Sequence, residues 1–128
     1  MTLSIHHLGL TVESLDEAKV FFVELLGWSV TREDSEYPSV FVSNGHVLLT
    51  LWRAKKTKPT AFDKDANIGL HHFAVQVESR QVLEKIYETL RESKFEVEFS
   101  PEYLRGGPTT HFMVYGPSQI RVEFICVE

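Results

Sequence analysis

Apolar and polar residues alternate with period two in two related stretches of this sequence. The stretches are HHLGLTVES at residues 6–14 and HHFAVQVES at residues 71–79. Such alternation is typical of a β-strand that is buried on one face. The first stretch predicts a strand at about residues 3–12, and the second predicts its counterpart in the other half of the 128-residue chain. We interpret the two stretches as the opening strands of two related modules.

The pattern that follows the first stretch predicts one helix and three further strands. Ser14 is expected to cap the helix, whose apolar face extends to Leu26, and Gly27 is expected to end it. One strand is expected to start at residues 28–31, and two more are expected at residues 39–43 and 47–52. Between the last two strands, Asn44-Gly45 predicts a tight hairpin. The order of elements in this half is therefore β-α-β-β-β.

The second half repeats this order. Ser79 is expected to cap a helix whose apolar face runs to Leu90, and strands are expected at residues 95–99, 110–115 and 120–126. The segment 100–108 is interpreted as a loop, and the long polar segment 53–69 as the linker between modules. We predict one α+β domain, 1–128, built from tandem βαβββ modules at 1–52 and 70–128. Its curved mixed sheets would surround a cleft, with the helices outside.

Strand alternation places polar side chains on the faces opposite the apolar ones. His7 and His72 occupy equivalent places in the two repeats, and Glu123 has the same parity in the last strand. Two imidazoles and one carboxylate suit a divalent metal such as Zn, Ni, Mn, Fe or Co, and they leave coordination positions open for substrate. The alternative is that both histidines are hydrogen-bonded structural residues. His6 and His71, on the opposite parity, are interpreted as structural or capping residues.

Other residues on the same faces are candidates for contact with a small-molecule substrate. His111 is the candidate for proton transfer, and a plain surface histidine is the open alternative. Arg121 could bind an anionic substrate group or pair with the neighbouring Glu123. Thr50 occupies the place in the first module that Glu123 occupies in the second. The full set of expected substrate contacts is Phe41, Leu48, Thr50, Trp52, Met113, Tyr115 and Arg121.

Composition narrows the functional classes. A net charge of −5 argues against binding to a nucleic-acid backbone. Cys126 is the only cysteine, which excludes internal disulfides and cysteine-based zinc sites. No signal peptide or membrane-spanning apolar run is recognisable, so a cytoplasmic protein without a membrane partner is expected.

The stretches HHLGLTVESLDEAKVFFVELLGWSV, HHFAVQVES and YGPSQIRVEF resemble the vicinal oxygen chelate superfamily of glyoxalases, bleomycin-resistance proteins and extradiol dioxygenases. The resemblance covers nearly the whole chain. It implies that His7, His72 and Glu123 are metal ligands, with Thr50 in a fourth ligand place that a threonine fills poorly. It also implies a homodimer.

Two functions follow from that resemblance. The first is a glyoxalase-like, metal-dependent enzyme of lyase, transferase or dioxygenase type, acting on a small oxygen-rich substrate. The alternative is a metal-free binding protein of the bleomycin-resistance type.

Overall fold

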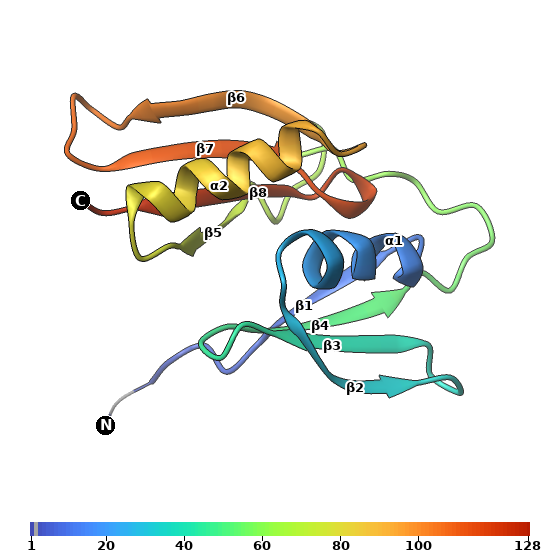
Figure 1. Cartoon of the computed structure of the whole chain (residues 1–128). Helices are drawn as coiled ribbons and strands as arrows, with labels where there is room; N and C mark the ends of the chain where they lie inside the picture. The colour runs from blue at the N-terminus through green and yellow to red at the C-terminus, as the bar shows by residue number, and fades with distance from the viewer. Residues whose placement is uncertain (2) are drawn as a thin grey trace. The chain divides into compact units, whose positions relative to one another are not determined.

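The chain forms two compact units in this computed structural model, which describes residue 1 and residues 3–128. The N-terminal unit comprises Met1–Thr60 and the C-terminal unit Ala61–Glu128. Each unit holds one four-stranded mixed sheet and one principal helix (Figure 1). The α+β prediction and the repeated β-α-β-β-β order are confirmed. The division falls inside the segment interpreted as a linker, and the Phe62 N–H donates to the Ser118 carbonyl in the C-terminal unit at 3.1 Å.

The sheet of the N-terminal unit has the strand order β1-β4-β3-β2. Its strands are β1 (Leu8–Val12), β2 (Ser29–Asp34), β3 (Ser39–Ser43) and β4 (Leu48–Arg53). Strand β1 runs parallel to β4, whereas the other pairs are antiparallel. The predicted strand at 3–12 is too long at its start. The ladder begins with Leu8 opposite Leu49, and β4 itself begins at Leu48, so β4 offers earlier residues no backbone partner.

The helix of the N-terminal unit begins and ends where the sequence predicts. The Ser14 hydroxyl accepts a hydrogen bond from the Glu17 N–H at 3.1 Å, and Gly27 ends the helix with a φ of +77°. The helix changes character along its length, from α1 (Leu15–Lys19) to a π-helical segment at Val20–Leu25. The adjacent side chains of Phe21 and Phe22 in this segment are both buried, with ring centroids 4.9 Å apart.

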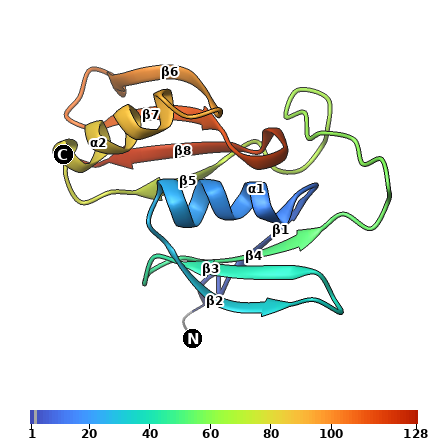
Figure 2. The same ribbon diagram turned by 45° about the vertical axis from the view of Figure 1, so that its right-hand side comes forward.

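The sheet of the C-terminal unit has the equivalent strand order β5-β8-β7-β6. Its strands are β5 (Phe73–Gln76), β6 (Glu96–Tyr103), β7 (Thr110–Tyr115) and β8 (Arg121–Cys126). Helix α2 (Arg80–Arg91) is capped by the Ser79 hydroxyl, and it packs against β6, β7 and β8 (Figure 2). A 3-10 turn at Pro117–Gln119 joins β7 to β8, as the predicted closing hairpin requires.

Strand β6 is longer than the sequence suggested. The segment 100–108 was predicted as a loop because of its proline and glycines, but β6 continues to Tyr103. Irregularities in the β6–β7 register between Phe99 and Glu102 accommodate Pro101. Pairing then resumes, with Glu102 opposite His111. This extension brings Glu102 beside the predicted site residues.

The apolar faces of the strands form the cores of the two units, as the alternation predicts. In β8, Val122 and Phe124 are fully buried, and Phe112 of β7 stacks on Phe124 with ring centroids 5.2 Å apart. Tyr87 of α2 contacts Phe112 on the same face, with centroids 5.6 Å apart. Helix α2 therefore covers the apolar face of its sheet. The alternate residues of β7 and β8, including His111 and Glu123, belong to the opposite face.

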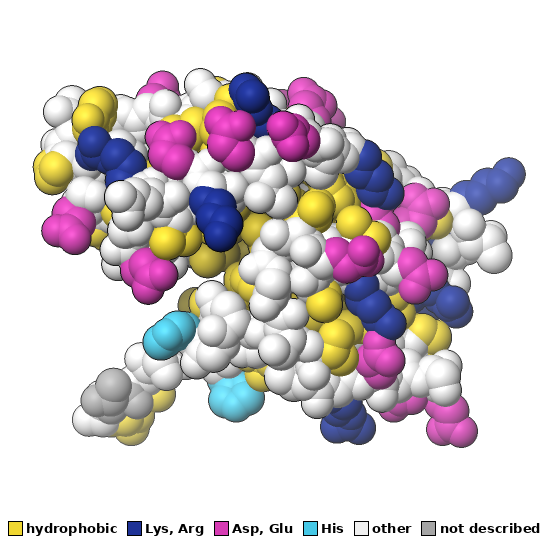
Figure 3. All heavy atoms as spheres, viewed as in Figure 1, with side chains coloured by type: hydrophobic (Ala, Val, Ile, Leu, Met, Phe, Trp, Pro, Cys, Tyr) yellow, Lys and Arg dark blue, Asp and Glu magenta, His cyan; other side chains and the backbone are white. Residues whose placement is uncertain are grey.

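The surface carries charges of both signs. In Figure 3, Lys and Arg side chains are interspersed with Asp and Glu side chains over the visible face. Positive side chains do not gather into one basic patch on this face, and the net charge is −5. Neither property is typical of a nucleic-acid-binding surface. Among the described residues, no helix is both long and apolar enough to span a bilayer.

Candidate functional site

Each His-His dipeptide forms one hydrogen-bonded pair of rings. The Nδ1 atoms of His71 and His72 lie 2.8 Å apart, and the Nδ1 atoms of His6 and His7 are separated by the same 2.8 Å. In each pair the rings meet edge to face. One Nδ1 of each pair must donate while the other accepts. Because Nδ1 is engaged in this way, Nε2 of His7 and of His72 stays available to other partners. The two repeats are thus alike in side-chain geometry as well as in sequence.

Both predicted histidine ligands lie immediately before the first strand of their unit. His7 precedes β1 and is exposed, whereas His72 precedes β5 and is half-buried, with a side-chain exposure of 31%. Strand β5 then pairs with β8 in parallel, with Ala74 opposite Glu123. In the N-terminal unit the corresponding pair is Gly9 opposite Thr50. The structure therefore gives Thr50 and Glu123 equivalent places in their sheets.

Glu123 is held between two histidines. Its Oε1 lies 3.2 Å from Nε2 of His72, and its Oε2 lies 2.6 Å from Nδ1 of His111. The carboxylate is buried, with a side-chain exposure of 10%. Burial of a carboxylate is costly unless it is hydrogen-bonded. His111 supplies a hydrogen-bond partner for one oxygen, and His72 lies within ion-pair distance of the other, so the carboxylate is held on both sides.

His111 extends this contact into a chain of four side chains. Its Nε2 lies 3.3 Å from Oε1 of Glu102, whose side chain is 59% exposed. The imidazole itself is buried and contacts the Phe99 ring, with centroids 5.2 Å apart. The alternative of a plain surface histidine is therefore wrong. His111 connects the buried Glu123 to an exposed carboxylate.

Arg121 pairs with Glu98, and not with the neighbouring Glu123 that the sequence suggested as a possible partner. Its Nε and terminal nitrogen donate to the two oxygens of Glu98 at 2.7 and 2.9 Å, so the expected alternative of pairing with Glu123 is wrong. The Arg121 guanidinium holds the pKa of Glu98 below its ordinary value. Tyr115 also hydrogen-bonds to Glu98, and burial is the main reason that the pKa of Tyr115 is raised. Met113 is buried on the same strand.

These residues can be tested for their fit to a divalent metal. Two donor atoms that bind one cation at about 2.1 Å lie about 3.0–3.4 Å from each other in octahedral or tetrahedral geometry. The distance of 3.2 Å from His72 Nε2 to Glu123 Oε1 meets that requirement. Within the described part of the chain, no three His, Cys, Asp or Glu side chains form a set that could hold a metal. The pair thus fits as two ligands of a site whose third ligand is not assigned by these contacts.

The N-terminal unit brings several predicted substrate contacts together. The Trp52 indole N–H donates to the Thr50 hydroxyl at 2.9 Å, and the rings of Trp52 and Phe41 lie 5.8 Å apart between centroids. A Cβ at Gly9 would lie only 3.2 Å from the Thr50 hydroxyl, so the small residue leaves room for that side chain. Leu48 is half-buried at the start of β4.

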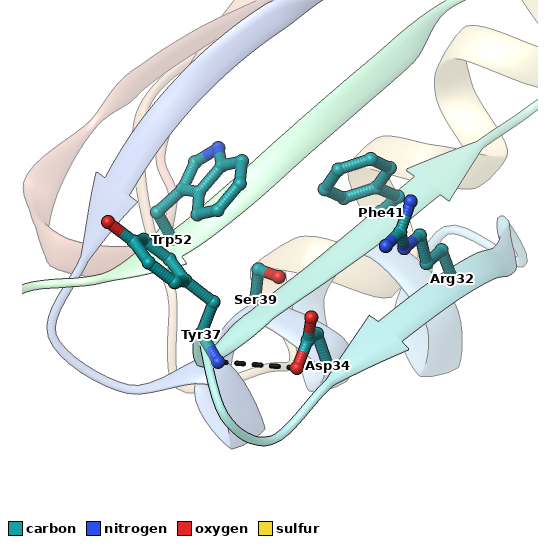
Figure 4. Close-up of a pocket in the computed structure, with 6 residues that line it drawn as sticks. All are labelled: Arg32, Asp34, Tyr37, Ser39, Phe41 and Trp52. Carbon is teal, nitrogen blue, oxygen red and sulfur yellow. Dashed lines mark hydrogen bonds between the residues drawn. The ribbon is translucent and has the colours of Figure 1, made fainter.

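A hollow of about 360 Å³ lies beside these side chains (Figure 4). Its lining comes from β2, β3, β4 and the β2–β3 turn, and consists of Arg32, Asp34, Tyr37, Ser39, Phe41 and Trp52. Phe41 and Trp52 were predicted as substrate contacts, whereas the other four were not. The sequence predicted that a strand starts at residues 28–31 but not where it ends, because the charged residues that follow do not alternate with apolar ones. Its continuation to Asp34 was therefore not predicted.

Comparison with known proteins identifies the family. Residues 4–124 match the model of the glyoxalase/bleomycin resistance protein/dioxygenase superfamily. The chain belongs to this superfamily. The resemblance inferred from the His-His repeats is therefore confirmed.

Individual relatives are more distant. A glyoxylase/bleomycin resistance protein/dioxygenase domain from Frankia sp. EAN1pec has the same fold, with a TM-score of 0.86, 21% identity and 100% coverage of both chains. FosX, a fosfomycin resistance protein from Listeria monocytogenes, has a TM-score of 0.74 and 13% identity, and the match covers 98% of this chain and 94% of that one. Catechol-2,3-dioxygenase from Bacillus subtilis (strain 168) is 24% identical over 98 residues, which cover 73% of this chain. This chain spans only 33% of that relative's length.

Proposed function

We propose that this protein is a divalent-metal-dependent enzyme that acts on a small, oxygen-rich substrate. The observation that carries the proposal is the buried Glu123 carboxylate beside His72 Nε2, with His111 on its other oxygen. Metal-binding histidines and carboxylates in proteins are characteristically oriented by such outer hydrogen bonds. Membership of a superfamily that contains glyoxalases and dioxygenases supports the same reaction class.

His7, His72 and Glu123 are the proposed ligands. His72 and Glu123 offer Nε2 and Oε1 at a separation compatible with one cation. His7 is the proposed third ligand, because its contact with His6 reproduces the contact of His72 with His71. Zn, Ni, Mn, Fe and Co all suit imidazole and carboxylate donors. When bound, such a cation would polarise the substrate oxygens that it contacts and stabilise negative charge on them.

The protein's own side chains would then orient groups and move protons. His111 holds Oε2 of Glu123 through Nδ1, which leaves Oε1 directed to His72. Its Nε2 faces Glu102, which reaches solvent. An imidazole can accept a proton at one nitrogen and release one from the other. His111 is therefore the proposed route for protons between the buried carboxylate and the exposed Glu102.

The second candidate function is a metal-free binding protein of the bleomycin-resistance type. The specific observation in its favour is the hollow lined by the aromatic rings of Tyr37, Phe41 and Trp52. A volume of about 360 Å³ lies within the range of small-molecule sites. Such a hollow could retain an organic compound without any metal.

Elemental analysis of protein purified without chelators tests the proposal. One metal ion per proposed site is expected in the wild type, and it should be lost in His7→Ala, His72→Ala and Glu123→Ala variants that keep their circular dichroism spectra. His46→Ala is the matched control, because His46 lies exposed in the β3–β4 turn. Protein that takes up none of the five metals after soaking would overturn the enzyme proposal and favour the binding protein.

Homodimerisation also belongs to this proposal. The resemblance to a family whose members often pair their modules between two chains supports it. Size-exclusion chromatography with light scattering should give twice the chain mass of 14.7 kDa. A monomer at micromolar concentration would contradict it.

A further inference from the structure

Three aromatic rings form the walls of the hollow in the N-terminal unit. The rings of Trp52 and Tyr37 lie 6.0 Å apart at an angle of 87°, and those of Trp52 and Phe41 lie 5.8 Å apart at 62°. Rings at such angles meet edge to face rather than stacking, so each can keep a face open to another flat molecule. The hydrogen bond from the Trp52 indole to Thr50 holds the central ring in place (2.9 Å). The hollow is therefore suited to a planar aromatic ligand.

The charges around the rings indicate what such a ligand carries. The Arg32 guanidinium lies 5.9 Å from the Phe41 centroid, and among the described residues it has no carboxylate within ion-pair distance. A guanidinium stacked at a ring keeps its in-plane N–H donors available for a carboxylate. At the other end, Lys55 Nζ donates to the Tyr37 hydroxyl at 3.3 Å and lies 5.1 Å from that ring's centroid. Both ends of the ring cluster are thus positively charged.

The single carboxylate of the hollow already has partners. Oδ1 of Asp34 accepts hydrogen bonds from the backbone N–H groups of Glu36 and Tyr37, at 2.9 and 3.2 Å. These bonds close the β2–β3 turn and offset part of the negative charge. Asp34 therefore has a structural function in the turn, and it makes a weaker receptor for a cationic ligand than Arg32 makes for an anionic one.

We infer that this hollow binds a planar aromatic carboxylate, with the ring among Trp52, Phe41 and Tyr37 and the carboxylate on Arg32. In Figure 4 the Arg32 guanidinium lies beside the Phe41 ring, and Tyr37 and Trp52 flank the other end. If the hollow is part of the active site, planar aromatic carboxylates are the substrate class, and this step rests on the proposed function. Binding itself requires only residues of the N-terminal unit.

The test is a titration of ¹⁵N-labelled, chelator-treated protein with benzoate, followed by the indole N–H signals of the two tryptophans. The Trp52 signal should shift and saturate. The Trp28 signal should stay unchanged, because Trp28 is buried against Phe22 with ring centroids 5.3 Å apart. Cyclohexanecarboxylate, which has the charge without the aromatic ring, should bind several-fold more weakly, and benzylammonium should leave Trp52 unmoved.

The variants separate the contribution of Arg32 from that of net charge. Arg32→Gln should weaken benzoate binding about tenfold, the usual effect of losing one charge-assisted hydrogen bond. Arg91→Gln changes the net charge equally but lies on α2 of the other unit, and its affinity should match the wild type. The inference is overturned if benzoate fails to shift Trp52, if benzylammonium binds more tightly, or if Arg32→Gln binds benzoate unchanged. Because no metal is present, these outcomes leave the metal proposal untouched.

Discussion

His111 Nδ1 lies 2.6 Å from Oε2 of Glu123, and both side chains are buried. The proposed ligand Glu123 is therefore oriented by a residue from the neighbouring strand rather than by its own strand. Such outer contacts commonly contribute a factor of about 10 to 100 to metal affinity. Metal binding is therefore expected to depend on this contact as well as on the ligands themselves.

Replacement of His111 tests this orienting role. We expect His111→Leu to weaken Zn²⁺ binding about 10- to 100-fold, because Oε2 of Glu123 loses its partner. His111→Asn places an amide donor near the position of Nδ1 and should retain most of the affinity. Isothermal titration calorimetry measures both variants, and circular dichroism verifies their folding. His46→Leu is the control. Equal affinities in the wild type and in folded His111→Leu would show that the contact does not orient a ligand.

The paired histidines lead to a second prediction. His71→Leu removes the Nδ1 partner of His72, which lies 2.8 Å away, and leaves the His72 ring free to rotate. We expect a loss of Zn²⁺ affinity of about tenfold, and a similar loss in His6→Leu. If His71 merely fills space at the start of β5, His71→Phe will bind the metal as the wild type does. That result would remove the functional interpretation of the His-His repeat.

The pKa of Glu98 predicts how stability responds to acid. The folded-state pKa is lowered by the hydrogen bonds from Arg121, so the ion pair stabilises the fold above the unfolded-state pKa, about 4.3 for glutamate. That stabilisation is lost as the pH falls through the lower folded-state pKa. Glu98→Gln should therefore cost about 1–2 kcal/mol at pH 7 and progressively less below about pH 4.

Thermal unfolding followed by circular dichroism between pH 3 and pH 7 measures this dependence. Glu96→Gln makes the same chemical change at an exposed position of the same strand, and a small, pH-independent effect is expected there. A constant difference in Tm between the wild type and Glu98→Gln over the whole range would contradict the assignment to the Arg121–Glu98 pair.

The sequence predicted those parts of the site that follow from strand alternation. The parities of Val122, Glu123 and Phe124 correctly placed the carboxylate opposite the core, because in a strand each residue faces away from its neighbours. The repeat likewise predicted that Thr50 and Glu123 are equivalent, and the pairings with Gly9 and Ala74 agree with this.

What could not be predicted depends on strand ends and on contacts across strands. Glu102 was missed because Pro101 suggests a loop, whereas irregular pairing allows β6 to continue past it. Arg32 and Asp34 were missed because β2 ends in charged residues that lack an apolar alternation. For Arg121 the sequence offered only an anionic substrate group or the neighbouring Glu123 as partners, whereas its partner Glu98 comes from β6. Such pairings depend on strand order, which local patterns do not determine.

The most direct test of the central claim is a histidine-ring ¹⁵N NMR spectrum recorded while Zn²⁺ is added. The claim is that His72 binds the metal through Nε2, beside Glu123, while its Nδ1 remains engaged with His71. We predict a metal-bound shift at Nε2 of His72, complete at one equivalent per site, with Nδ1 retaining its hydrogen-bonded shift. A spectrum in which Zn²⁺ leaves the His72 ring unchanged, or binds at its Nδ1, would contradict the account.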